Sequence, residues 1–554
     1  MPSHLRSLPR AAGLRLGAAL ALAPLGACGR EFPRQPADSP TVRVGVAEPV
    51  SSFRLVDAAS LSVARFADLV YEGLTQADPA GNIRPMLATH WDISADARTF
   101  RFHLRRGVRF HDGTPFGAAD VVRAWEAALR EPPGAETHPY MLDPIEGAEA
   151  FSRGKAPRVT GLRVVDDSTL EVRLTQPLVL FPALLSLQST FVGARAADAG
   201  HPLGTGPWRW VRGRPNTDDE IWLARHDGYW GAPPRLDSVV MRAVPDSLQL
   251  AAFRTHWLDF ANPVAVQAQA AVAASGDVGY LSGSGHGLTR LVINLREPVF
   301  RDVRVRRALN HAIDVERLVR TFPERALAPA TGAIPPQLPG GAGLDSLTGA
   351  AAGAARAPYG FDPALARRLL AEGGYPLHRP LRLYALAPRR GVYRSQLGRL
   401  IRDYFTAVGL TVEYHEASDA AAALADGRAD LVLENWAADY ADGDAMLHPL
   451  YYGATAGAAG NSGGFRDPVA DSLIDLERRE ADPARRAALL READARVFDQ
   501  AANVFIWFTR STTAYSLRLR GWQPTTYTTR YQRLELAGAD ADADADADAQ
   551  ASRR

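Results

Sequence analysis

Short apolar strands alternate regularly with helices along residues 362–434. Asp362 and Pro363 give a helix start with the capping residue and the proline in their preferred places. Beyond it we expect strands at 381–386, 410–414 and 430–434, separated by helices at 395–408 and 420–425. Such alternation predicts a largely parallel sheet with helices on its faces. Because ligands of these sheets bind beyond the carboxyl ends of the strands, residues 435–440 become the first candidates for a binding site.

The N-terminal half shows mixed α and β patterns. Residues 41–46 alternate valine with other residues, which predicts a strand. Residues 100–104 and 108–110 alternate in the same way on either side of a short turn, which predicts a hairpin. His103 and His111 would then lie on opposite strands of this hairpin, but no third ligand indicates a metal site.

The first 27 residues have the pattern of a secretion signal. Three arginines precede the apolar stretch 16–27, which is too short to span a bilayer. The stretch ends in Leu-Gly-Ala before Cys28, which resembles the lipobox of bacterial lipoproteins, where the cysteine carries diacylglycerol. An ordinary secretory signal with a chance cysteine is the alternative, although Cys28 is the only cysteine of the chain. We therefore expect a lipoprotein signal peptide at 1–27 and a tether at 28–40, with the mature protein anchored through Cys28 outside the cytoplasm, in the periplasm or at the cell surface.

Composition excludes several classes of function. The 63 cationic and 62 acidic residues are spread along the chain, so no basic stripe indicates nucleic-acid binding. The only lysine, Lys155, lies outside any phosphate-binding loop, so this chain is not itself a P-loop ATPase. A single cysteine also excludes an internal disulfide framework. Residues 538–554 are mostly alternating alanine and aspartate, which predicts a disordered acidic tail, with cation binding as the alternative.

Several spaced motifs occur in a fixed order along residues 41–537. They lie at residues 66–74, 83–88, 100–113, 204–208, 229–231, 302–314, 362–375 and 436–440. Together they closely resemble family 5 of the bacterial extracellular solute-binding proteins, the peptide- and nickel-type receptors of ABC importers. Ordered and spaced matches of this kind are more specific than any single motif.

This resemblance implies an α/β (mixed α+β) fold of two lobes joined by a hinge, with ligand enclosed between the lobes. On the family's pattern, lobe I comprises residues 41–65, 203–288 and 508–537, an extra N-terminal subdomain comprises 66–202, and lobe II comprises 289–507. The resemblance also implies a receptor, which we expect to be a monomer, that delivers a peptide to a membrane permease with separate ATPase subunits. We expect no cofactor and no metal. Most signature side chains are expected to be structural, with Asp120 capping a helix.

Asp439 is the main candidate for a ligand contact. In oligopeptide-binding relatives the matching aspartate accepts the α-ammonium group of the ligand, and such a charge-assisted bond contributes about 1.5–3 kcal/mol. Trp436 and Tyr440 flank it and would cover apolar parts of the ligand, while Asn435 would add a polar group. The alternative is a loop aspartate that binds nearby backbone. Gly443 stands where relatives often have proline, which would relax the loop.

The loop after the first strand is a second candidate surface. In relatives this loop reaches the cleft, so Ser52, Phe53 and Arg54 are expected near the ligand. Arg54 would pair with a ligand carboxylate, with an exposed surface arginine as the alternative. Asn294 is expected to be structural.

Two other functions fit parts of the sequence. A receptor for a nickel chelate, an opine, a sugar or another solute would use the same fold. Residues 460–464 fit the G-x-S-x-G nucleophile elbow, which would make Ser462 the nucleophile of an extracytoplasmic hydrolase. That motif requires a strand directly before it and a helix directly after it, whereas small-residue loop sequence flanks it here. We therefore expect no enzymatic activity.

Overall fold

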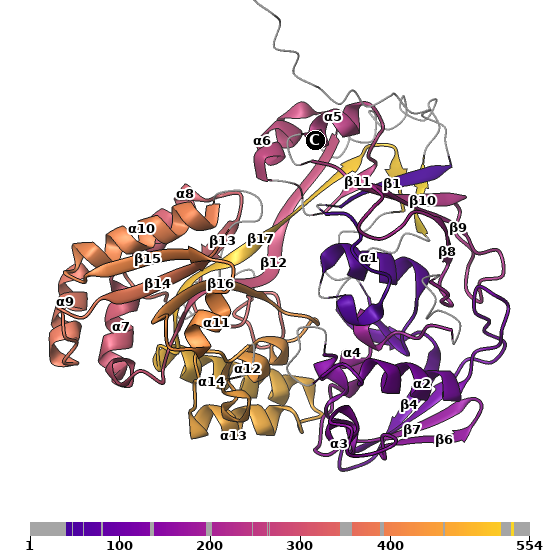
Figure 1. Ribbon diagram of the computed structural model, residues 1–554, viewed down its shortest axis with the longest axis horizontal. Helices are drawn as coiled ribbons and strands as arrows, with labels where there is room; N and C mark the ends of the chain where they lie inside the picture. The colour runs from indigo at the N-terminus through magenta and orange to yellow at the C-terminus, as the bar shows by residue number, and fades with distance from the viewer. Residues whose placement is uncertain are drawn as a thin grey trace, which may run out of the picture.

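A computed structural model describes residues 40–536 except 47, 59, 79–80, 133–137, 195–201, 246–247, 263, 265, 277, 344–356, 388–392, 458–459 and 522–532. Within these residues the chain forms two halves that long strands connect (Figure 1). The predicted signal peptide, the tether before residue 40, Cys28 and the acidic tail lie outside the described residues.

One mixed sheet of eleven strands runs through both halves. Its order is β15 (Val412–Ala417), β14 (Leu381–Leu386), β16 (Leu431–Ala437), β12 (Val278–Ile293), β17 (Asn503–Ser516), β11 (Phe260–Ala261), β1 (Thr41–Val46), β10 (Ser238–Ala243), β9 (Glu220–Arg225) and β8 (Trp208–Arg212), and β13 (Ala326–Pro329) also pairs with β17. The strand predicted at 41–46 is confirmed as β1. Because parallel and antiparallel pairs occur in the same sheet, the mixed α/β class predicted from the sequence is confirmed.

The strands predicted in the C-terminal half form a parallel part of this sheet. β14 is parallel to both β15 and β16, and α9 (Pro363–Glu372), α10 (Tyr393–Ala407) and α11 (Ala420–Ala425) accompany them. The predicted cap at Asp362 is confirmed, because its side chain accepts a hydrogen bond from the backbone N–H of Leu365. β16 extends beyond the predicted end at 434 as far as Ala437, because its pairing with β12 continues to Gly287.

β12 and β17 connect the two halves. They pair antiparallel, with shifts in register between Ser284 and Leu288 and between Thr289 and Arg290. Figure 1 shows both strands running from the half that holds β14 and β16 to the half that holds β1 and β10. The lobe boundaries predicted at 288/289 and 507/508 therefore fall within this pair of long strands.

A separate sheet of four strands lies in the N-terminal half. Its order is β4 (Ala88–Ile93), β5 (Thr99–Leu104), β7 (Thr169–Arg173) and β6 (Leu162–Asp166). Phe100 and Phe102 are fully buried in a core that also contains Trp125 of α2 (Ala118–Ala128). The predicted capping role of Asp120 is confirmed, because its carboxylate accepts a hydrogen bond from the N–H of Gly117 at 3.1 Å.

The predicted hairpin of residues 100–104 and 108–110 is wrong. β5 pairs with β4 and β7 instead, and Arg109 forms only an isolated bridge to Pro115. The two histidines are therefore held apart in different surroundings: His103 stacks on His90 across the β4–β5 pair, whereas His111 packs against His226. A pattern of alternating residues gives a strand's faces but not the identity of its partner strand.

The remaining elements complete the two halves. They are β2 (Thr75–Ala77), β3 (Ile83–Pro85), α3 (Ala148–Ser152), α4 (Phe181–Leu184), α5 (Gln249–Arg254), α6 (Val266–Ser275), α7 (Val303–His311), α8 (Val315–Thr321), α12 (Asp444–Tyr451), α13 (Pro468–Glu477), α14 (Pro483–Asp499), β18 (Leu519–Arg520) and β19 (Glu535–Leu536). α1 (Leu61–Val70) buries Val63, Phe66 and Leu69 in the same core as β1 and β10. The subdomain boundary predicted at 65/66 therefore falls inside this helix.

Three signature motifs meet at the fully buried carboxylate of Glu72. It accepts hydrogen bonds from Thr205 Oγ1 at 2.8 Å, Tyr229 OH at 2.7 Å and Trp230 Nε1 at 2.7 Å. Burial raises the pKa of Glu72 to about 7, and these hydrogen bonds and the guanidinium of Arg105 oppose that rise. A buried acceptor that three donors share joins distant parts of the chain, so these signature residues are structural.

Candidate functional site

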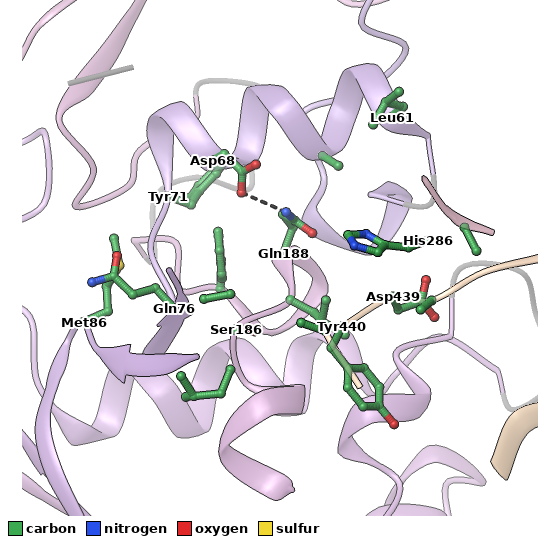
Figure 2. Close-up of a pocket in the computed structure, with 18 of the residues that line it drawn as sticks. Leu61, Asp68, Tyr71, Gln76, Met86, Ser186, Gln188, His286, Asp439 and Tyr440 are labelled. Carbon is green, nitrogen blue, oxygen red and sulfur yellow. Dashed lines mark hydrogen bonds between the residues drawn. The ribbon is translucent and has the colours of Figure 1, made fainter. Parts of the chain in front are cut away.

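A cavity of about 310 Å³ lies between the two halves. One wall comes from α1, β2 and the short helix η3 (Gln188–Thr190) with its neighbours, and the other from β12, β17 and the loop after β16. Figure 2 shows polar side chains from both walls, including Asp68, Gln188, His286 and Asp439. Small-molecule sites span roughly 300–1,000 Å³, so the cavity has the size of a site for a small ligand.

Asp439 lies on the cavity wall, two residues after the end of β16. Its side chain keeps exposed surface, and its carboxylate accepts a hydrogen bond from the phenol of Tyr140. Burial raises the pKa of Asp439, and the hydrogen bond from Tyr140 opposes that rise. Tyr140 belongs to the predicted extra subdomain and Asp439 to the predicted lobe II, so this contact joins the two sides of the cavity.

A buried network of charges holds the loop that carries Asp439. Tyr440 lines the cavity and donates its hydroxyl to Asp444 at 2.6 Å. Asp444 in turn accepts two hydrogen bonds of 3.0 Å from Arg478. Asp442 accepts two from Arg486, at 2.7 and 2.6 Å. Paired hydrogen bonds between arginine and carboxylate fix geometry as well as charge, so the loop is rigidly attached to α13 and α14.

Gly443, which we expected to relax this loop, lies in a closely packed part of it. A Cβ atom added at Gly443 would lie 2.5 Å from the carbonyl oxygen of Pro339 and 2.9 Å from Ile334 Cδ1. Glycine is therefore present because the backbone packs too closely for any side chain.

Two of the predicted ligand residues do not line the cavity. Asn435 and Trp436 belong to β16 itself. Asn435 accepts a hydrogen bond from Thr289 Oγ1 on the neighbouring strand at 3.3 Å. Trp436 donates its indole N–H to the carbonyl of Ala445 at 3.3 Å and packs against the core. Because the strand continues past residue 434, the side chain of Asn435 contacts the neighbouring strand and that of Trp436 contacts the start of α12.

The loop of Ser52, Phe53 and Arg54 also lies outside the cavity lining. Ser52 Oγ accepts the backbone N–H of Arg54 at 3.0 Å, and the ring of Phe53 stacks on Phe66 at 4.5 Å between centroids. The guanidinium of Arg54 pairs with Glu131. The structure therefore gives Arg54 a protein partner in place of the expected ligand carboxylate.

The wall that faces Asp439 contains residues that the sequence did not single out as ligand contacts. Asp68 of α1 accepts a hydrogen bond of 2.8 Å from Gln188 Nε2, and both side chains line the cavity (Figure 2). His286 of β12 also lines the cavity, and burial lowers its pKa to about 4. Asp68 lies within the signature motif of residues 66–74, most of whose side chains we expect to be structural. Its helical position, on the opposite side from the buried Phe66 and Leu69, was the available signal.

Ser462 does not lie in a nucleophile elbow, so the structure gives the hydrolase hypothesis no support. The element before it is the 3-10 helix η8 (Gly453–Thr455) and the next helix, α13, begins only at Pro468. Asn461 donates its amide to the carbonyls of Tyr452 and Phe465, which fixes the segment as a loop. In the described part of the chain no three histidine, cysteine, aspartate or glutamate side chains gather as a metal site, and no helix there has the length and apolarity of a membrane span.

Residues 82–458 match the family described as bacterial extracellular solute-binding proteins, family 5, middle region. The chain is 28% identical over 472 residues to the glutathione-binding protein GsiB of Pectobacterium atrosepticum, across 81% of this chain and 85% of that protein. It is 25% identical over 449 residues to the dipeptide-binding protein of Escherichia coli, across 76% of this chain and 80% of that protein.

The fold resembles that of the periplasmic binding protein DppA from Helicobacter pylori, solved in complex with the peptide STSA. The TM-score is 0.74 at 23% sequence identity, and the alignment covers 90% of this chain and 98% of that one. This likeness confirms the two-lobed architecture that the sequence predicted.

Proposed function

The chain belongs to family 5 of the bacterial extracellular solute-binding proteins, and we propose that it captures a peptide for an ABC importer in the cavity between its lobes. The observation that carries the peptide ligand is the carboxylate of Asp439, which lies on the cavity wall at the end of a central strand. A carboxylate in a desolvated cavity forms a strong bond with an ammonium group. Two of the similar proteins, the dipeptide-binding protein of Escherichia coli and the peptide-bound DppA of Helicobacter pylori, agree with a peptide ligand.

In this proposal the two lobes close on the ligand. Lobe I contains residues 41–65, 203–288 and 508–537, lobe II contains 289–507, and residues 66–202 form a subdomain on the lobe I side. A ligand that touches both walls favours the closed form through its additional contacts there. The closed receptor, a monomer, then delivers its ligand to a permease whose separate ATPase subunits supply the energy.

The experiment compares a dipeptide amide with its N-acetylated form. Ala-norleucine amide has no terminal carboxylate, so acetylation removes its only charge and tests recognition of the amino terminus. Calorimetry should show binding of the free amine and at least tenfold weaker binding of the acetylated form. Equal affinities would contradict capture through the amino terminus. Native mass spectrometry of protein purified from its own host identifies the natural ligand, and a nickel chelate, an opine or a sugar in the cavity would contradict the peptide proposal.

The proposal places the receptor on a membrane through Cys28. The cysteine follows an apolar stretch that ends in Leu-Gly-Ala and is the only thiol of the chain. We expect cleavage after residue 27 and lipidation of Cys28, so Cys28→Ser should move the protein from the membrane fraction to the soluble extracytoplasmic fraction. Fractionation with an antibody against the lobes measures this shift, with Ser39→Ala in the tether as control. Membrane association that persists in Cys28→Ser would contradict the lipid anchor.

A further inference from the structure

The hairpin of β2 and β3 forms one edge of the cavity. Ala77 of β2 and Ile83 of β3 line the cavity from this side. Ala441, two residues after Asp439, lines it from the opposite side. Gly81, which lies between β2 and β3, packs against Ala441, and both residues are half-buried. The two sides of the molecule therefore touch directly at the edge of the cavity.

The contact leaves no room for a side chain at Gly81. A Cβ atom added there would overlap the Cβ atom of Ala441, whereas the Cα atom of Ala441 would lie at an ordinary contact distance of 3.9 Å. Gly81 also has a φ of 86°, a conformation that glycine adopts without steric penalty and other residues do not. The missing side chain thus meets two requirements, and only the overlap with Ala441 involves the other side of the cavity.

Both sides of this contact are held by hydrogen bonds or ion pairs. In the turn, the carboxylate of Asp78 accepts the backbone N–H of Asn82 at 2.9 Å, and the carbonyl of Asp78 accepts that of Gly81 at 2.8 Å. In the loop, Ala441 directly precedes Asp442, whose buried ion pair attaches it to α14. Because neither segment shifts easily, a methyl group added at position 81 would push the two sides of the cavity apart.

We propose that Gly81 and Ala441 form the stop on which the lobes close, so that tight capture of a ligand depends on the missing side chain at Gly81. This inference rests on the proposed receptor function and names a pair of positioning residues for it. Ala441 lines the cavity and Gly81 does not, so Gly81 acts on the ligand through closure. In the closed form the ligand contacts both walls, and a change that keeps the walls apart removes the contacts that slow its release.

The variant Gly81→Ala tests the stop. Stopped-flow tryptophan fluorescence on the mature receptor should show that Ala-norleucine amide dissociates about tenfold faster or more, while its association rate stays within about threefold. Small-angle scattering should show that the peptide decreases the radius of gyration less than it does in the wild type. An unchanged dissociation rate would overturn the proposal, because the methyl group would then fit without opening the lobes.

Two further variants separate the contact from backbone strain. Gly107 has a similar φ of 77°, but among the described residues a Cβ atom added there meets no atom within 4 Å. Gly107→Ala should therefore release the peptide at the wild-type rate to within about twofold. Ala441→Gly removes the overlapping Cβ atom, so Gly81→Ala added to that variant should change the dissociation rate by less than about threefold. A tenfold change that persists in the Ala441→Gly background would assign the effect to strain and overturn the stop.

A cross-link tests the contact without a ligand. Cys28→Ser leaves the chain without a thiol. In that background, Gly81→Cys with Ala441→Cys should form a disulfide on oxidation, because a slight separation of the lobes gives the Cβ distance of about 3.5–4.5 Å that a disulfide needs. Gly107→Cys with Ala441→Cys is the control and should remain reduced.

The outcomes separate this inference from the proposed function. If the wild type binds Ala-norleucine amide and Gly81→Ala releases it no faster, the stop is overturned and the peptide receptor stands. If the wild type does not bind the peptide, capture through the amino terminus is contradicted, and the cross-link alone decides the stop. A disulfide between positions 81 and 441 then supports it, and failure of that disulfide to form overturns it.

Discussion

Replacement of Asp439 by alanine is expected to weaken the binding of Ala-norleucine amide by about 30- to several-thousand-fold. Among the described residues, Asp439 is the one carboxylate that lines the cavity on its wall. Its removal leaves a desolvated ammonium without a partner, which costs about 2–5 kcal/mol. Asp439→Asn should lose much of the affinity as well, because it retains the shape of the side chain but not its charge. Calorimetry on the three proteins measures both losses.

A matched control and a second ligand make this result specific to Asp439. Asp403→Ala removes an exposed carboxylate of α10 that pairs only locally with Arg402, so it should bind as the wild type does. The N-acetylated peptide, which has no ammonium, should bind the wild type and Asp439→Ala with similar weakness. If Asp439→Ala instead binds the free amine as tightly as the wild type, Asp439 is a structural loop residue that holds Tyr140.

The position of Asp439 could be predicted because it depends on a local pattern. An apolar strand of a parallel sheet ends near Asp439. Local residue patterns of this kind also predicted β14 and α11 with their observed bounds. The end of β16 was not predicted, because it depends on pairing with β12, which lies far away in the sequence, and Asn435 and Trp436 therefore lie within the strand. Hydrogen-bond partners of a strand are a long-range property, and for the same reason the hairpin around His103 was mispredicted.

The opposite wall could not be predicted from local pattern. The buried face of α1 is visible in the spacing of Val63 and Phe66, but the surroundings of its polar side chains depend on how the two halves meet. Asp68 therefore became a candidate only when the structure placed it on the cavity wall. Phe53 is a second residue whose surroundings local pattern does not give: its partly buried ring stacks on Phe66 against the core.

Replacement of Arg486 by methionine is expected to destabilise lobe II by about 3–5 kcal/mol. Arg486 forms two hydrogen bonds with Asp442 and lies 2.8 Å from Glu477 Oε2, and all three side chains are at least nine-tenths buried. Methionine keeps much of the packing but leaves two buried carboxyl groups without their cation. Denaturant unfolding, monitored by fluorescence, measures the loss of stability as a lower denaturant midpoint.

The neighbouring Arg485 provides a matched control for Arg486. Its side chain is 78% exposed and lies 3.3 Å from Glu480 at the surface, so Arg485→Met should change stability by less than about 0.5 kcal/mol. Adding Asp442→Asn to Arg486→Met should restore part of the lost stability, because one uncompensated charge disappears.

Burial and the nearby Asp444 raise the pKa of Glu477 to about 10, so Glu477 is protonated at neutral pH and the main loss falls on Asp442. Since Asp442 fixes the loop that carries Asp439, Arg486→Met should also weaken Ala-norleucine amide binding at temperatures where lobe II remains folded. Unchanged stability in Arg486→Met would mean that this network does not hold the binding loop.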